Sequence, residues 1–97
     1  MIGLISLNFK TSPIEIREIF YFQDSEKMKF FELLSSECPV EGLVILSTCN
    51  RTELYYEYEN HIGEEKKIFH LIMKCLVKYK KYSEGLSPYV ATKTGSM

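Results

Sequence analysis

The sequence predicts an α+β domain in which two long helices cover one face of an antiparallel sheet. Short runs of apolar and β-branched residues alternate with segments of helical periodicity, in the order strand, helix, strand, strand, helix, strand. The 97 residues, 45% of them hydrophobic, suffice for one core but not for two. This order is that of the split βαβ, or ferredoxin-like, arrangement, with a short extra helix after the first strand.

The first strand is expected over residues 1–8, where apolar side chains alternate with small and polar ones. A short helix should follow over residues 13–20. Ser12 would cap it, Pro13 would occupy its first position, and Glu15 would lie in its first turn.

A second helix is expected to be capped by Asp24 or Ser25. Apolar residues recur at helical spacing between residues 28 and 34, which predicts one buried face. Pro39 should end this helix, because proline disfavours a helical residue before it.

Two strands are expected next, over residues 40–46 and 53–58, joined as a hairpin. The polar connection contains Asn50-Arg51 and lacks the Asn-Gly or Asp-Gly pair of a tight turn. It should therefore exceed two residues, with Asn50 a candidate for a left-handed conformation.

A third helix should begin at Glu64, because apolar residues from Ile68 to Tyr79 fall at helical spacing, with glutamates before them and lysines after them. Residues 86–91 are a possible last strand, with Pro88 at its start or on an edge. The tail, residues 92–97, is expected to be frayed. In this topology the first and third strands are central.

The net charge of −1 argues against nucleic-acid binding by bulk charge. Two interpretations of the late lysines stay open, a patch that contacts phosphates or the solvent face of a helix, and the second is favoured. The late lysines are Lys66, Lys67, Lys74, Lys78, Lys80 and Lys81.

The sequence has no apolar run long enough for a membrane span and no signal-peptide pattern, so a cytoplasmic location is expected.

The cysteines Cys38, Cys49 and Cys75 are odd in number and far apart, which predicts reduced thiols and no paired-cysteine motif. His61 and His70 lack the spacing of helical metal ligands, so no metal site is expected. The glycines are scattered and form no G-x-G-x-x-G motif, so no NADPH site is expected within the chain.

Cys49 is the most informative residue, because it lies in the polar connection between two strands. A rigid sheet can hold such a thiol within reach of a substrate. Arg51, two residues away, would favour the reactive thiolate. Taken alone, a single cysteine is more often a small buried hydrophobe than a reactive thiol.

Two longer segments carry a resemblance. Residues 44–55, VILSTCNRTELY, resemble the active-site signature of the glutamyl-tRNA reductase family, and residues 7–18, LNFKTSPIEIRE, resemble its N-terminal motif. Members of that family are several-fold longer. The resemblance therefore implies that residues 1–97 correspond to the N-terminal catalytic domain. It also implies that a Rossmann domain for NADPH and a helical dimerisation domain lie outside this chain.

The resemblance implies a reaction in which Cys49 attacks glutamyl-tRNA, forms a glutamyl thioester, and hydride from NADPH then yields glutamate-1-semialdehyde for tetrapyrrole synthesis. Thr48 and Arg51 match positions that hold the glutamyl group, and a guanidinium suits its γ-carboxylate. Asn50 would orient substrate or simply form the turn. The full-length enzyme would be a homodimer, with the next enzyme, glutamate-1-semialdehyde aminotransferase, as a possible partner.

The first motif leaves more open. Thr11 and Arg17 match it, yet Arg17 could equally pair with Glu18 or another surface carboxylate. Phe9 stands where the family usually has histidine, which favours packing at this position. The family's catalytic histidine falls just beyond residue 97, and neither His61 nor His70 matches it. We therefore expect this chain alone to be unable to complete the reduction.

Two other functions remain open on the sequence alone. One is a non-catalytic ferredoxin-like module that binds RNA or a protein. The other is a small thiol-redox protein based on Cys49, for which a resolving cysteine at suggestive spacing is lacking.

Overall fold

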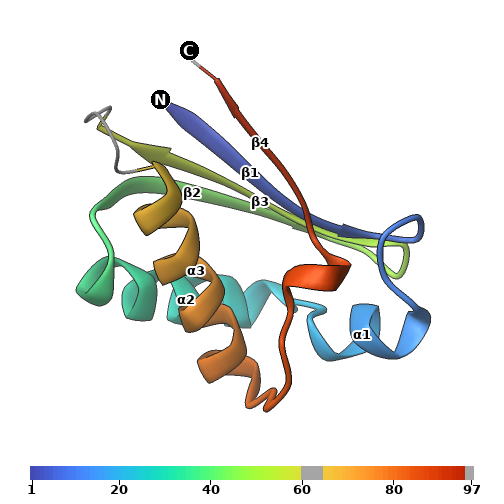
Figure 1. Ribbon diagram of the computed structural model, residues 1–97. Coiled ribbons are helices and arrows are strands. Elements are labelled where there is room, and N and C mark those ends of the chain that lie inside the picture. Colours follow the sequence, from blue (N-terminus) through green and yellow to red (C-terminus); the bar gives the residue numbers. More distant parts are fainter. Residues whose placement is uncertain (60–64, 96–97) are drawn as a thin grey trace.

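The computed structural model describes residues 1–59 and 65–95. Figure 1 shows α2 and α3 on one face of a four-stranded sheet, with α1 beside one end of it. Mixed α+β content and an antiparallel sheet confirm the coarse prediction. The elements in chain order are β1 (Ile2–Asn8), α1 (Ile14–Ile19), α2 (Asp24–Glu37), β2 (Val40–Ser47), β3 (Arg51–Tyr58), α3 (Glu65–Lys80), a 3-10 helix (Ser87–Tyr89) and β4 (Ala91–Gly95).

The strands lie in the order β2-β3-β1-β4, and each neighbouring pair is antiparallel. The first and third strands are therefore central, as expected. In the register between them, Leu7 faces Thr52 and Asn8 faces Arg51. Consequently the end of the first strand lies directly beside the start of the third.

The core lies between the sheet and the two long helices. Alternate side chains of the central strands point toward the helices, and they are fully or almost fully buried. Helix residues at i, i+4 spacing meet them from the other side. The innermost side chains are Ile5, Leu7, Leu54, Tyr56, Phe30, Leu34, Ile72 and Leu76.

The expected cap of the short helix is wrong. Pro13 precedes α1, and no side chain caps it. The Ser12 hydroxyl instead donates to the carbonyl oxygen of Tyr89 over 2.7 Å. A partner 77 residues away takes the hydroxyl, and so ties the start of α1 to the end of the chain.

The cap of α2 is Gln23, not Asp24 or Ser25. The backbone N–H of Gln23 donates to Oε1 of Glu26 over 3.0 Å, which forms a reciprocal capping box. Asp24 lies inside the helix and pairs with Lys27 at 3.0 Å. The helix ends at Glu37, just before Pro39, as predicted.

The predicted last strand is also displaced. Residues 87–89 form a 3-10 helix that contains Pro88, and β4 begins only at Ala91. Proline has no N–H for a strand ladder, so the pairing with β1 starts after it. Residues up to Gly95, expected to be frayed, are paired with β1 instead. Residues 96–97 and the expected start of the third helix, Glu64, lie outside the described residues.

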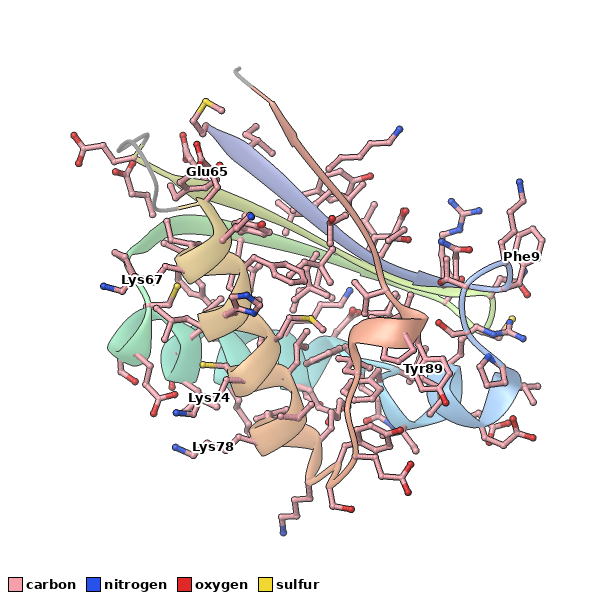
Figure 2. All side chains as sticks on the ribbon, viewed as in Figure 1. Phe9, Glu65, Lys67, Lys74, Lys78 and Tyr89 are labelled. Carbon is pink, nitrogen blue, oxygen red and sulfur yellow. The ribbon has the colours of Figure 1, made fainter. Side chains whose placement is uncertain are left out.

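The lysines of α3 differ among themselves. Lys67, Lys74 and Lys78 project outward from α3 on the side far from the β2–β3 turn (Figure 2), which agrees with a solvent face. Lys80 does not, because its side chain is only 10% exposed. None of the helices in the described ranges is long and apolar enough to cross a membrane.

Lys80 fastens the segment between α1 and α2 to the end of α3. Its ammonium donates to the Tyr21 carbonyl, lies 3.1 Å from Oε2 of Glu26, and sits 4.3 Å from the centre of the Phe22 ring. The hydrogen bond from the Gln23 backbone N–H, together with the Lys80 ammonium, lowers the pKa of Glu26.

Gly3 and Gly42 offer a matched pair of substitutions. A Cβ atom on Gly3 would lie 2.1 Å from Cζ of the buried Tyr56 ring, whereas on Gly42 the nearest atom would be 3.5 Å away. We expect Gly3→Ala to lower the free energy of unfolding by about 1–3 kcal/mol through overpacking. Gly42→Ala should change it by less than about 1 kcal/mol. Urea unfolding measures both, and equal effects would contradict the packing described.

Glu26→Gln should lower the free energy of unfolding by about 1–2 kcal/mol at neutral pH, because it leaves the largely buried Lys80 ammonium without its carboxylate partner. Glutamine still completes the capping box, so the change isolates the charge. The pKa of Glu26 is lowered on folding, so its contribution is present above the ordinary value of 4.5 and is lost as the pH falls through the lower folded value. The two proteins should therefore converge in stability in acid.

The matched control for that charge is Asp24→Asn. Asp24 also pairs with a lysine, but its side chain is 99% exposed. We expect little change in urea unfolding at any pH, because exposed ion pairs are weak. A gap between wild type and Glu26→Gln that persists unchanged at pH 3 would contradict the charge pairing.

Candidate active site

The turn that carries Cys49 consists of Thr48, Cys49 and Asn50, between β2 and β3. The Thr48 hydroxyl oxygen accepts from the backbone N–H groups of Asn50 (3.2 Å) and Arg51 (3.3 Å). The connection is longer than a two-residue turn, as predicted. Among the described non-glycine residues only Lys81 has a positive φ, of 56°, so the left-handed conformation expected for Asn50 is wrong. The Thr48 side chain closes the turn in its place.

A chain of hydrogen bonds fixes the base of the turn. The Ser47 and Thr52 hydroxyls share a hydrogen bond of 2.7 Å across the last pair of the hairpin. The backbone N–H of Phe22 donates to the Ser47 oxygen over 2.9 Å. The segment that follows α1 is thereby held against the end of β2.

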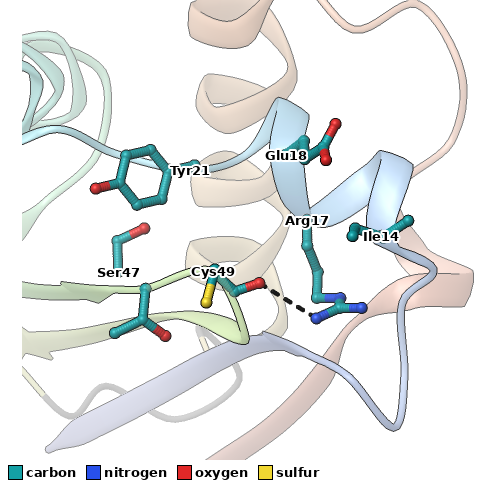
Figure 3. A pocket seen from close by; sticks show the side chains of 7 residues that line it. Ile14, Arg17, Glu18, Tyr21, Ser47 and Cys49 are labelled. Carbon is teal, nitrogen blue, oxygen red and sulfur yellow. Dashed lines mark hydrogen bonds between the residues drawn. The ribbon is translucent and has the colours of Figure 1, made fainter.

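A cavity of about 570 Å³ opens between α1 and the turn (Figure 3). Four of its lining residues have the spacing i, i+3, i+4, i+7 and come from α1 and the residues just after it, so one face of this helix lines the cavity. The other lining residues come from the end of β2 and the turn. In chain order the lining residues are Ile14, Arg17, Glu18, Tyr21, Ser47, Thr48 and Cys49.

Arg17 connects α1 to the turn directly. Its Nη1 donates to the carbonyl oxygen of Cys49 over 3.2 Å, as the dashed line in Figure 3 marks. Its Nε is buried and has no acceptor among the described residues. The guanidinium forms no ion pair with a carboxylate in that part of the chain, so the alternative of a pair with Glu18 or another surface carboxylate is not found there. The carbonyl of Cys49 takes that place.

A second polar cluster joins β1 to β3 beside the turn. The Asn8 amide donates to the Ser6 hydroxyl (3.0 Å), which in turn donates to Oε2 of Glu53 (3.2 Å). Nη1 of Arg51 lies 3.8 Å from Oε1 of the same carboxylate. Arg51 and Asn50 do not line the cavity, whereas Thr48 and Cys49 do.

The first motif closes the loop after β1. The hydroxyl oxygen of Thr11 accepts a hydrogen bond from the backbone N–H of Asn8 (3.2 Å). The side-chain oxygen of Asn8 accepts one from the backbone N–H of Lys10 (2.9 Å). Phe9 is 56% exposed, so the packing expected for it is wrong. The chain turns at Asn8, which lifts the Phe9 side chain away from the core at the end of the molecule seen in Figure 2.

The three cysteines fall into two classes. Cys49 is exposed, while Cys38 and Cys75 are buried. Burial raises the pKa of the Cys38 thiol. Burial and its hydrogen bond to the Glu37 carboxylate (3.1 Å) raise the pKa of Cys75 to about 12. Only Cys49 combines access to solvent with a cavity beside it.

Sequence reasoning missed that Ile14, Glu18, Tyr21 and Ser47 line the cavity. The helical spacing of the first, second and third was a usable signal, but nothing in the sequence placed α1 over the turn. His70 is exposed on α3 and contacts the Phe69 ring, and His61 lies outside the described residues. Within the described ranges no cluster of His, Cys, Asp or Glu has the composition of a metal site.

Comparison with known proteins identifies the family of the chain. Residues 5–96 match the family described as glutamyl-tRNAGlu reductase, N-terminal domain. A glutamyl-tRNA reductase of Clostridium beijerinckii is 42% identical over 85 residues, which are 84% of this chain and 20% of that protein.

Enzymes of the same name from Halalkalibacterium halodurans and Brevibacillus brevis are 52% and 48% identical over 52 residues. Each match covers 54% of this chain and 11% or 12% of the relative. The chain thus spans a small part of the length of these relatives. The chain belongs to the family of the glutamyl-tRNA reductase N-terminal domain.

Proposed function

We propose that this chain is the acyl-transfer domain of a glutamyl-tRNA reductase, in which Cys49 takes the glutamyl group from its tRNA. The observation that carries the proposal is the exposed Cys49 thiol in a hydrogen-bonded turn beside a cavity of about 570 Å³, while the other two thiols are buried. Membership of the family supplies the substrate class. The longer enzyme would reduce glutamyl-tRNA to glutamate-1-semialdehyde, the first step of tetrapyrrole synthesis.

The step assigned to this chain transfers the glutamyl group from a ribose oxygen of the tRNA to the sulfur of Cys49. The Cys49 thiolate sulfur attacks the ester carbonyl carbon, a carbon–sulfur bond forms, and the carbon–oxygen bond to the terminal ribose breaks. The tRNA leaves with its hydroxyl oxygen, which takes up the proton that the thiol lost. The product is a glutamyl thioester on Cys49, which accepts hydride more readily than the oxygen ester does.

Thr48 and Arg51 are proposed to hold the glutamyl group, with Asn50 beside them. Thr48 lines the cavity, and its oxygen already accepts two backbone hydrogen bonds. Arg51 flanks the turn, and its guanidinium can bind both oxygens of a carboxylate. Its 3.8 Å separation from Glu53 is loose enough for a substrate carboxylate to compete.

The described residues do not fit a dinucleotide. The strands of the sheet are antiparallel, the loop from β1 to α1 contains no glycine, and no crevice of a parallel sheet is present among them. We therefore propose that NADPH is bound by the remainder of the longer protein, which would also make its dimer. Association with the aminotransferase that uses the product, and a cytoplasmic location, belong to the same proposal.

We also assign the fold to the ferredoxin-like class. The strand order β2-β3-β1-β4, with α2 and α3 on one face, supports this assignment. In that arrangement the β2–β3 turn opens at one end of the sheet, where α1 stands as an addition after β1.

Thiol labelling of the folded chain should distinguish the cysteines. We expect iodoacetamide to modify Cys49 faster than Cys75 by a factor on the order of 100 or more, because Cys75 is buried and mainly protonated. Peptide mass mapping at timed intervals gives the separate rates. In denaturant all three cysteines should react alike, and comparable rates for Cys49 and Cys75 in the folded chain would contradict the proposed access.

Acyl transfer itself can be tested on this chain. With glutamyl-tRNA carrying labelled glutamate, we expect a glutamyl adduct on Cys49 and no aldehyde when NADPH is added. Formation of the adduct needs only the thiol and a positioned ester. Cys49→Ser should lose the adduct, since a hydroxyl without an adjacent base is a far weaker nucleophile.

Mass measurement of the intact chain and of its peptides reads out both results. An adduct on Cys38 or Cys75 would show that another cysteine is the nucleophile. Aldehyde produced by this chain with NADPH would refute the proposed division between this domain and the longer protein.

A further inference from the structure

The two charged side chains that line the cavity beside Cys49 are opposite in sign and point in different directions. Its charged lining residues are Arg17 and Glu18. In Figure 3 the Glu18 carboxylate points away from Cys49, and the Arg17 guanidinium points toward the Cys49 carbonyl. A molecule that approaches the thiol through this cavity therefore meets the Arg17 cation beside the turn, while the Glu18 carboxylate is directed away from it.

The position of that cation is fixed. Nη1 of Arg17 is bound to the Cys49 carbonyl at 3.2 Å, so the guanidinium moves together with the turn. Its Nε is buried without an acceptor in the described part of the chain. A guanidinium has five N–H donors in a fixed plane, and the one hydrogen bond described for Arg17 uses only one of them, so outer N–H groups remain for an incoming oxygen acceptor.

Arg51 stands in a different environment, although it is nearer to Cys49 in the sequence. It does not line the cavity, and the carboxylate of Glu53, whose side chain is 14% exposed, lies 3.8 Å from it. That carboxylate offsets part of its field. The uncompensated charge within the cavity comes from Arg17.

We propose that Arg17 is a specificity-determining residue that selects anionic substrates for Cys49, while its Nη1 holds the Cys49 carbonyl in place. The inference rests on the proposed function, because a glutamyl group carries such a negative charge on its γ-carboxylate. Arg17 attracts the anion and holds an oxygen of it within the cavity. This role is additional to that of Arg51.

A pair of alkylating reagents that differ in charge tests the proposal on this chain. The rate of carboxymethylation of Cys49 by iodoacetate is divided by its rate with neutral iodoacetamide, both measured by peptide mass mapping. We expect Arg17→Gln to lower this ratio about five- to tenfold, as the loss of one nearby charge implies. Arg17→Lys, which keeps the positive charge, should retain most of the wild-type ratio.

Two controls separate a local charge from the charge of the whole chain. Lys74→Gln removes an exposed cation far from the turn and should leave the ratio within about twofold of wild type. In wild type the ratio should fall as salt is raised from about 0.01 to about 0.5 M, because salt screens the charge of Arg17. This measurement uses the wild-type protein, so it does not depend on whether a variant folds. The ratio should be nearly salt-independent in Arg17→Gln.

An unchanged ratio in Arg17→Gln, or a salt-independent ratio in wild type, would overturn the proposal. The proposal would also be overturned if the ratio fell in Arg51→Gln but not in Arg17→Gln. None of these results depends on the glutamyl adduct. If the adduct forms on Cys49 while the reagent ratio ignores Arg17, acyl transfer stands and the role of Arg17 falls. If the ratio depends on Arg17 and no adduct forms, the proposed acyl transfer falls instead.

Discussion

The pairing of β1 with β3 is the constraint on which the rest of the structure depends. It places Asn8 opposite Arg51 and Leu7 opposite Thr52, so two segments far apart in the sequence meet at one end of the sheet. A shift of one residue would move Leu7 and Leu54 from the core to the other face, and their complete burial opposes such a slip. The hydrogen bond from Ser6 to Glu53 joins two residues that face each other in this register.

The cavity depends on a second set of contacts, which hold a short helix over the turn. A six-residue helix without a side-chain cap has little stability of its own. Three long-range contacts secure it, from Ser12 to Tyr89, from Lys80 to the Tyr21 carbonyl, and from the Phe22 N–H to Ser47. These contacts come from the 3-10 helix, α3 and β2. The environment of Cys49 is therefore a product of the whole domain and not of the turn alone.

Much of the fold follows from local patterns. The apolar spacing of residues 68–79 predicted α3, and the β-branched and aromatic runs predicted the hairpin. These features succeed because each element buries a face with its own periodicity. The position of Cys49 in the connection between two strands led to the expectation of a reachable thiol, and the thiol is exposed.

Several of the failures share one cause, which is that the deciding partner lies far away in the sequence. Ser12 has the residue type of a cap, but a distant carbonyl takes its hydroxyl. Lys80 resembles its solvent-facing neighbours, yet a carboxylate of α2 and an aromatic ring enclose it. The sequence left a surface ion pair open for Arg17, whereas the position of α1 over the turn brings its guanidinium to the Cys49 carbonyl.

The central position of β1 also affects the order in which the domain forms on the ribosome. This strand is made first, but one neighbour ends at Tyr58 and the other begins at Ala91. Its apolar side chains thus leave the exit tunnel before either hydrogen-bonding partner does. The α1 contacts that need Tyr89 and Lys80 arise later still. Nascent chains should therefore expose an unpaired apolar strand until β3 has also emerged, and such a segment is of the kind that chaperones bind.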